Sequence, residues 1–133
     1  MKSYAEIMPA VNQIEYHPRF ASPLTYAKCK ELGILVQSYG ILKSILIANS
    51  RVNDVLDEIA ERTERNSIQT CIRWAVQKKV CVIFRSGSKE NQASNLASLD
   101  GPDLSLEDMA SIDALNENYP YYWLPEPSIQ TLM

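Results

Sequence analysis

The sequence predicts an α/β protein built on a parallel sheet. Three short apolar segments with strand character lie at residues 10–15, 34–39 and 80–84. Segments with helical spacing separate them, and strands joined through helical crossovers run parallel. Parallel strands need cover on both faces, so three of them with about five helices indicate part of a larger architecture.

The first strand and helix have clear boundaries. The strand, within "AVNQIEY", alternates apolar and polar residues between two prolines. A helix is predicted to begin at Ser22-Pro23, because serine caps helices and a proline in the first turn leaves no N–H unpaired. Gly33 supplies the left-handed residue that commonly ends a helix. The second strand, 34–39, follows directly.

A less regular connection, "KSILIANS", is predicted after the second strand. Two amphipathic helices follow it, and the second is predicted to be capped by Ser67. After the third strand, a helix should begin near Ser88. A last helix opens at "SLED", where Ser105 and Asp108 have the spacing of a capping box.

The length then sets the architecture. A complete (β/α)8 barrel of the TIM type takes about 250 residues, whereas this chain has 133. The chain is therefore predicted to be one domain, residues 1–133, that forms the C-terminal half of such a barrel. Its uncovered strand edges predict self-association.

Composition excludes several classes of function. The net charge of −3 offers nothing to nucleic acid or to an anionic membrane. No apolar run approaches the ~20 residues that a bilayer requires, and the N-terminus lacks the apolar core of a signal peptide. The three cysteines lack metal-ligand spacing, which predicts free thiols in the cytoplasm and no metal site.

Four segments in order resemble the aldo/keto reductase family. Members of this family are (β/α)8 barrels that use NADPH, less often NADH, to reduce aldehydes and ketones. The resemblance implies an NADP(H)-dependent oxidoreductase with a small-molecule carbonyl substrate and NADPH as cofactor. The segments are "PAVNQIEYHP" (9–18), "LGILVQSYGIL" (32–42), "SIQTCIRWAVQKKVCVI" (67–83) and "LSLEDMASIDALNEN" (104–118).

Two strand-end residues acquire roles from this resemblance. Gln13 matches the glutamine that hydrogen-bonds the nicotinamide carboxamide, since an amide both donates and accepts. Tyr39 matches the aromatic residue that stacks on the nicotinamide ring. Residue type alone leaves the alternatives open, namely a polar strand end for Gln13 and a core tyrosine for Tyr39.

The connection after Tyr39 departs from the family pattern. Many members have Tyr-Ser-Pro-Leu-Gly here, whereas this chain has "YGILK". Gly40 stands where a serine would donate to the cofactor pyrophosphate, and Leu42 keeps the apolar position. Both are predicted to line the cofactor site, although the short loop that follows is not expected to clamp it.

The stretch "VCVIFRSGSKENQASNL" places an arginine and serines between a strand and a helix. The resemblance assigns Arg85 and Ser86 to the adenosine 2′-phosphate and Asn95 to the adenine. A helix N-terminus attracts anions, and arginine pairs with phosphate in a bidentate way. Asn91 replaces a family arginine and is included in the site, with a weaker grip on NADPH expected. Arg85 as a solvated strand-end charge is the alternative.

The catalytic residues of the family match nothing in this chain. In the family, the catalytic aspartate, tyrosine, lysine and histidine come from the first half of the barrel. No catalytic residue is therefore predicted here, and activity of this chain alone is not expected. His17 is expected to pack in a loop, and Trp123 either lines the substrate mouth or caps the barrel wall. Three readings remain: the cofactor-binding half of a reductase, a non-catalytic binding or assembly module, and a reductase completed by a separate N-terminal half.

Overall fold

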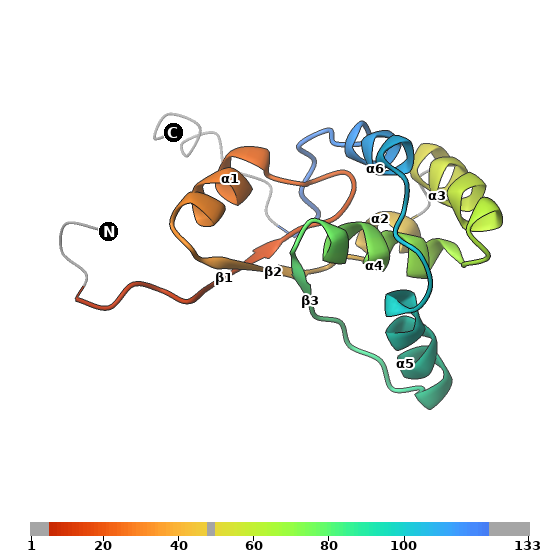
Figure 1. Ribbon diagram of the computed structural model, residues 1–133, viewed down its shortest axis with the longest axis horizontal. Coiled ribbons are helices and arrows are strands. Elements are labelled where there is room, and N and C mark those ends of the chain that lie inside the picture. The colour runs from red at the N-terminus through yellow and green to blue at the C-terminus, as the bar shows by residue number, and fades with distance from the viewer. Residues whose placement is uncertain (1–5, 48–49, 123–133) are drawn as a thin grey trace.

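A computed structural model describes residues 6–47 and 50–122 of the chain. Its three strands form one parallel sheet in the order β1-β2-β3, as predicted (Figure 1). The strands are β1 (Val11–Glu15), β2 (Leu35–Tyr39) and β3 (Cys81–Val82). The helices are α1 (Pro23–Glu31), α2 (Lys43–Leu46), α3 (Ser50–Arg62), α4 (Ser67–Gln77), α5 (Lys89–Leu96), the 3₁₀ helix η1 (Ala97–Leu99) and α6 (Leu106–Asp113).

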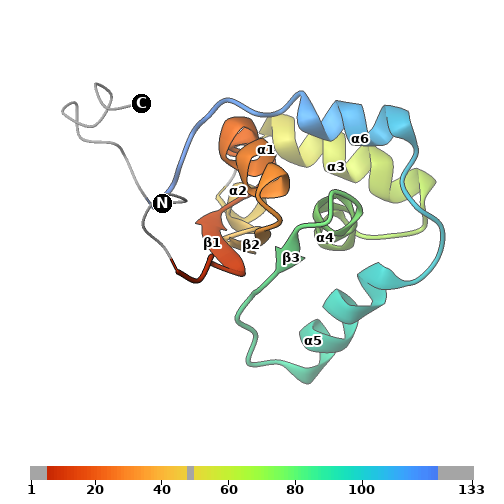
Figure 2. The same ribbon diagram turned by 60° about the vertical axis from the view of Figure 1, so that its left-hand side comes forward.

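Parallel pairing aligns the strands so that all three end at the same edge of the sheet. Gln13 of β1 lies opposite Gln37 of β2, which lies opposite Cys81 of β3. Figures 1 and 2 show α1, α4 and α6 on one side of the strands. The connections after Glu15, Tyr39 and Val82 therefore leave the sheet as neighbours.

The helix boundaries confirm two predicted caps and correct two others. Ser88 and Ser105 cap α5 and α6 as predicted, each accepting a hydrogen bond from the backbone N–H three residues later. Helix α1 begins at Pro23 with Ser22 at the N-cap position, as predicted, but Ser22 has a left-handed backbone (φ 38°) and its hydroxyl makes no capping bond. The cap of α4 is Asn66 rather than Ser67, and Gln69 completes its capping box.

Two further expectations need correction. The connection after β2 was expected to be less regular, but it contains the one-turn helix α2. The third strand was expected over residues 80–84 and forms only at Cys81–Val82. Ile83 still donates its N–H to the carbonyl of Ser38, but Ile83 and Phe84 are both exposed. Pairing beyond Val82 is limited to this one backbone bond, because the exposed side chains of Ile83 and Phe84 gain little burial there.

The core lies between the sheet and the helices. Trp74 of α4 is fully buried, stacks on Tyr16 at 5.2 Å between ring centroids, and donates its indole N–H to Asp113 at 2.8 Å. Cys29 and Cys71 are buried free thiols, and burial raises the pKa of Cys71. The helix-covered face of the sheet thus carries a continuous core, as the amphipathic spacing predicted.

The opposite face of the sheet is open among the described residues. Val11, Leu35 and Ile83 are 37–45% exposed, although they lie on strands or directly after one. Gln13 donates to Gln37 across this face at 2.6 Å, and Gln37 approaches Cys81 at 3.9 Å. In a closed barrel this face would be the interior.

None of the helices in the described part of the chain has the length and apolar character that a bilayer crossing requires.

Trp74 should dominate the stability of the helix-covered core. We expect Trp74→Ala to lower the free energy of unfolding by about 3–5 kcal/mol, because it removes a buried ring and leaves a cavity. Leu106→Ala is the matched control, since Leu106 is 90% exposed and should change stability by about 0.5 kcal/mol or less. Urea unfolding followed by circular dichroism measures both. Equal effects of the two variants would contradict this view of the core.

Candidate cofactor-binding site

A pocket opens where β2 and β3 end. Its volume is about 590 Å³, and it gathers Tyr39, Gly40 and Leu42 from the end of β2 with Arg85 from beyond β3. Four of the eight residues predicted from the sequence therefore line one pocket. The remaining lining residues are Ile41, Lys43, Leu46, Ile83, Phe84 and Tyr122.

The electrostatics of this pocket favour an anion. Lys43 and Arg85 supply two cations, and the described residues that line it include no acid. Lys43 places its ammonium 5.2 Å from the centre of the Tyr122 ring, which is within cation–π range. Among the residues that the structure describes, no carboxylate forms an ion pair with Arg85. Both cations are thus available to a negatively charged ligand.

Gly40 is required by the shape of the pocket. Its φ of +70° is a left-handed conformation that side chains rarely adopt. A Cβ atom at this position would lie 2.9 Å from Cε2 of Tyr122. The Tyr122 ring also meets the Tyr39 ring edge-on, with centroids 5.6 Å apart. A serine at position 40, as in the family pattern, would therefore collide with the Tyr122 ring where it now lies.

Gln13 lies beside this pocket rather than in it. Its side chain is exposed, donates to Gln37 and lines a smaller depression of about 290 Å³ that it shares with Tyr39. Tyr39 lines both the larger pocket and this depression, so it lies between Gln13 and the rest of the predicted cofactor site.

The corner between β3 and α5 is held by its own hydrogen bonds. The Ser86 hydroxyl bonds the backbone of Ser88 at 3.3 Å, and the Gln92 amide donates to the Ser86 carbonyl at 2.8 Å. Ser88 accepts from the N–H of Asn91 and donates to the Glu90 carboxylate. The turn after Arg85 is therefore braced by bonds within the chain, and one acidic side chain, Glu90, lies in the first turn of α5.

The two asparagines of α5 lie outside the Arg85 pocket. Asn91 is exposed, and only its backbone N–H contributes to the cap of α5. Asn95 is buried and lines a separate, largely apolar pocket of about 770 Å³ between β3, α4 and α5. Phe84 lines both pockets, so the two cavities adjoin each other across one side chain.

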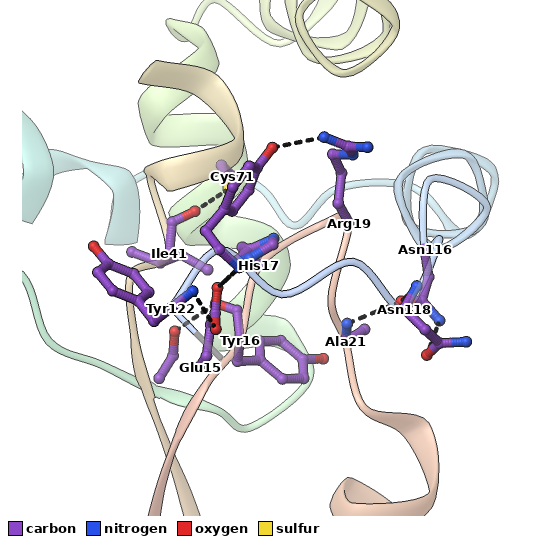
Figure 3. A network of polar contacts seen from close by, with 12 residues as sticks. Glu15, Tyr16, His17, Arg19, Ala21, Ile41, Cys71, Asn116, Asn118 and Tyr122 are labelled. Atoms are coloured by element: carbon purple, nitrogen blue, oxygen red, sulfur yellow. Dashed lines mark hydrogen bonds and ion pairs between the residues drawn. The ribbon is translucent and has the colours of Figure 1, made fainter. Parts of the chain in front are cut away.

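A buried polar network lies at the end of β1 (Figure 3). The Glu15 carboxylate accepts from His17 Nε2 at 3.1 Å and from the backbone N–H groups of Tyr121 at 2.6 Å and Tyr122 at 3.2 Å. His17 is fully buried and packs against the Tyr121 ring at 5.0 Å, in agreement with the predicted loop-packing role. Burial lowers the pKa of His17, although Glu15 opposes that shift.

Sequence reasoning missed three residues of this region. Glu15 had a signal, because it is a charged residue between two apolar ones at the end of a strand. Lys43 also had a signal, because it directly follows Leu42 in the same connection. Tyr122 had none, since it meets the pocket from a segment that is distant in sequence. Trp123, predicted either to line the substrate mouth or to cap the barrel wall, lies outside the described residues. Within the described ranges, no group of three or more acidic, histidine or cysteine side chains could hold a metal ion.

Comparison with known proteins decides the family. The sequence profile described as "Aldo/keto reductase family" matches residues 1–117. The chain belongs to the aldo/keto reductase family. It is 37% identical over 114 residues to the glyoxal reductase of Bacillus subtilis, a match that covers 86% of this chain and 40% of that protein.

Solved structures agree with this assignment. An aldo-keto reductase, MGS-M4, from a deep-sea metagenome library matches with a TM-score of 0.83 and 29% identity, over 90% of this chain and 44% of that chain. A Gox0644 variant solved in complex with NADPH matches with a TM-score of 0.76 and 29% identity, over 86% and 41% respectively. The fold is therefore part of a TIM barrel, and the chain spans about two fifths of the length of these aldo/keto reductases.

Protonation of His17 should make stability depend on pH. The pKa of His17 is lowered in the folded protein from its ordinary value of 6.5. Stability should therefore be complete above pH 6.5 and decline as the pH falls, by up to about 1.4 kcal/mol per pH unit. Urea unfolding at pH 7.5 and pH 5.5 measures this decline.

His17→Gln is the control for this prediction. Glutamine can still donate to Glu15 but does not titrate, and the chain has no other histidine. The variant should lose less stability than the wild type between the two pH values. Identical losses would show that His17 does not cause the pH dependence.

Proposed function

We propose that this chain is the NADP(H)-binding half of an aldo/keto reductase that reduces small-molecule aldehydes or ketones. The observation that carries the proposal is the single pocket at the ends of β2 and β3. It combines the aromatic ring of Tyr39, the backbone at Gly40, and two cations with no acid among its described lining residues. A flat ring joined to phosphate groups is the ligand chemistry that such a pocket suits.

Within this proposal, Tyr39 stacks on the nicotinamide and Gln13 reaches its carboxamide. Gln13 can turn from Gln37 towards a ligand because both side chains lie on the open face of the sheet. Gly40 and Leu42 line the path of the cofactor between its two ends. Arg85 pairs with the adenosine 2′-phosphate, which NADPH carries and NADH lacks.

The turn at residues 85–88 extends the phosphate site. Ser86 would donate its hydroxyl to the same phosphate after releasing its weak bond to Ser88. Asn95 on α5 is assigned to the adenine, and Asn91 stands at the position of a family arginine in the same site. Because Asn95 is buried beside the neighbouring cavity, its contact requires the adenine to enter from the side of Phe84.

The relatives support the reaction class. The glyoxal reductase of Bacillus subtilis is named for reduction of a small carbonyl compound, and the Gox0644 structure contains NADPH. We assign no catalytic residue to this chain, because none of its residues matches the proton-donating positions of the family. Completion of the reaction would then require the half of the barrel that supplies them.

The role of Arg85 is tested by comparing two cofactors. Arg85→Ala should weaken NADPH binding roughly ten- to a hundredfold, because it removes a charge-assisted contact worth about 1.5–3 kcal/mol. NADH binding should stay nearly unchanged. Fluorescence titration with each cofactor measures the dissociation constants, which we expect near the millimolar range for NADPH.

Lys30→Ala is the matched control, since Lys30 is an exposed cation near the opposite ends of the strands. It should leave both dissociation constants unchanged. Equal weakening of NADPH and NADH by Arg85→Ala would remove Arg85 from the 2′-phosphate site.

The second candidate function is assembly through the open face of the sheet. Val11, Leu35 and Ile83 are exposed on or directly after strands, and the outer edges of β1 and β3 are unpaired among the described elements. Exposed apolar faces and sheet edges favour association. This candidate corresponds to a non-catalytic binding module and does not require a cofactor.

Association is tested with a substitution on that face. The wild type should form larger species as its concentration rises, and Leu35→Ser should shift the distribution towards the monomer. Leu106→Ser provides the control, because Leu106 is more exposed than Leu35 but lies on α6. Sedimentation velocity at several concentrations measures the species. A wild type that stays monomeric throughout the micromolar range would exclude this candidate.

A further inference from the structure

The end of β1 binds a distant segment of the chain through a buried carboxylate. Glu15 is only 3% exposed, and its two oxygens accept three hydrogen bonds. Two of these come from the backbone N–H groups of Tyr121 and Tyr122, more than a hundred residues later in the sequence. A glutamine could not replace it fully, because its NH₂ group would face an N–H donor.

A second anchor holds the same segment, residues 116–122, which we call the strap. Arg19 donates to the Glu117 carboxylate and to the Tyr121 hydroxyl, and its guanidinium lies 4.4 Å from the centre of the Tyr119 ring. The carbonyl of Arg19 accepts from the backbone N–H groups of Glu117 and Tyr119. The strap is therefore fixed along its length to the loop that follows β1 (Figure 3).

The described part of the strap ends at the cofactor pocket. Tyr122 lines that pocket, and its ring packs edge-on against the Tyr39 ring. The Lys43 ammonium lies within cation–π range of the same ring, which also fills the space that a Cβ atom at Gly40 would need. The backbone N–H of Tyr122 binds Glu15. The position of one pocket wall thus depends on Glu15, which does not line that pocket but lines the smaller depression beside Gln13 and Tyr39.

We propose that Glu15 is a positioning residue of this pocket, which holds the strap so that Tyr122 forms a wall beside any ring that stacks on Tyr39. The proposal rests on the proposed function for the identity of that ring, the nicotinamide of NADPH. The hydrogen bonds that join the strap to Glu15 and Arg19 are made within the chain itself. Tyr122 is then the residue through which Glu15 affects binding.

The first experiment measures the strap without a ligand. Amide hydrogen exchange of Tyr121 and Tyr122, followed by nuclear magnetic resonance, should become at least about tenfold faster in Glu15→Gln. Glu15→Asp keeps the charge but shortens the side chain, and it should accelerate exchange less. Glu31→Gln is the control, because it removes an exposed carboxylate of α1. Unchanged exchange in Glu15→Gln and Glu15→Asp would overturn the anchoring role.

The second experiment asks whether Glu15 acts through Tyr122. NADPH titration should show several-fold weaker binding for Tyr122→Ala and nearly unchanged binding for Tyr122→Phe, which keeps the ring. Glu15→Gln should weaken binding to a similar extent as Tyr122→Ala. The double variant should be no weaker than Tyr122→Ala alone, because residues that act through one contact are not additive.

The outcomes separate this inference from the proposed function. Additive losses in the double variant would show that Glu15 has only a general structural role and would overturn the inference. Unchanged NADPH binding in Tyr122→Ala would remove Tyr122 from the pocket wall while leaving the proposed function intact. A wild type that binds no NADPH would contradict the proposed function and the wall role together, and the exchange rates would still decide whether Glu15 holds the strap.

Discussion

Parallel pairing of β1, β2 and β3 is the constraint on which the candidate site depends. Because the three strands run in the same direction, the residues that follow them meet at one edge of the sheet. The register places Glu15 opposite Tyr39, and the next bond of the β2–β3 ladder joins Ile83 to Ser38. Gly40, Lys43 and Arg85 therefore line one pocket, although they are separated by up to 45 residues of sequence.

One buried charge and one exposed charge lie at this edge, and they have different consequences. Glu15 is fully removed from water, so its carboxylate needs the donors that it receives from His17 and the strap. Arg85 is exposed, and its charge is not used by a described carboxylate. The first charge orders the protein, whereas the second is available to a ligand. Such a division is expected where a rigid scaffold positions a binding site.

The open face of the sheet is the face that a complete barrel would enclose. The chain's matches cover 40–44% of the relatives' length, and the apolar residues of β1 and β2 are half exposed on this face. Both proposals use the accessible inner face of the sheet. In the cofactor proposal Gln13 reaches the ligand from this face, and in the assembly proposal its exposed apolar residues contact another chain.

The sequence was sufficient for the three strands, the longer helices and their order, because strand alternation, helical stripes and caps such as Ser88 and Ser105 are local signals, but it did not predict the one-turn helix α2. It failed at the capping bond of Ser22 and at Ser67, where the neighbouring backbone decided the cap, and at residues 83–84, where strand length depended on burial. Residue types alone left the roles of Tyr39 and Arg85 open, and only the resemblance to the aldo/keto reductase family indicated them as candidates for a shared site. Only the tertiary structure could show that Glu15 holds the strap and that Tyr122 meets Gly40, because these contacts join segments more than 80 residues apart. The sequence determined which local structures form, and packing between distant segments decided which side chains meet.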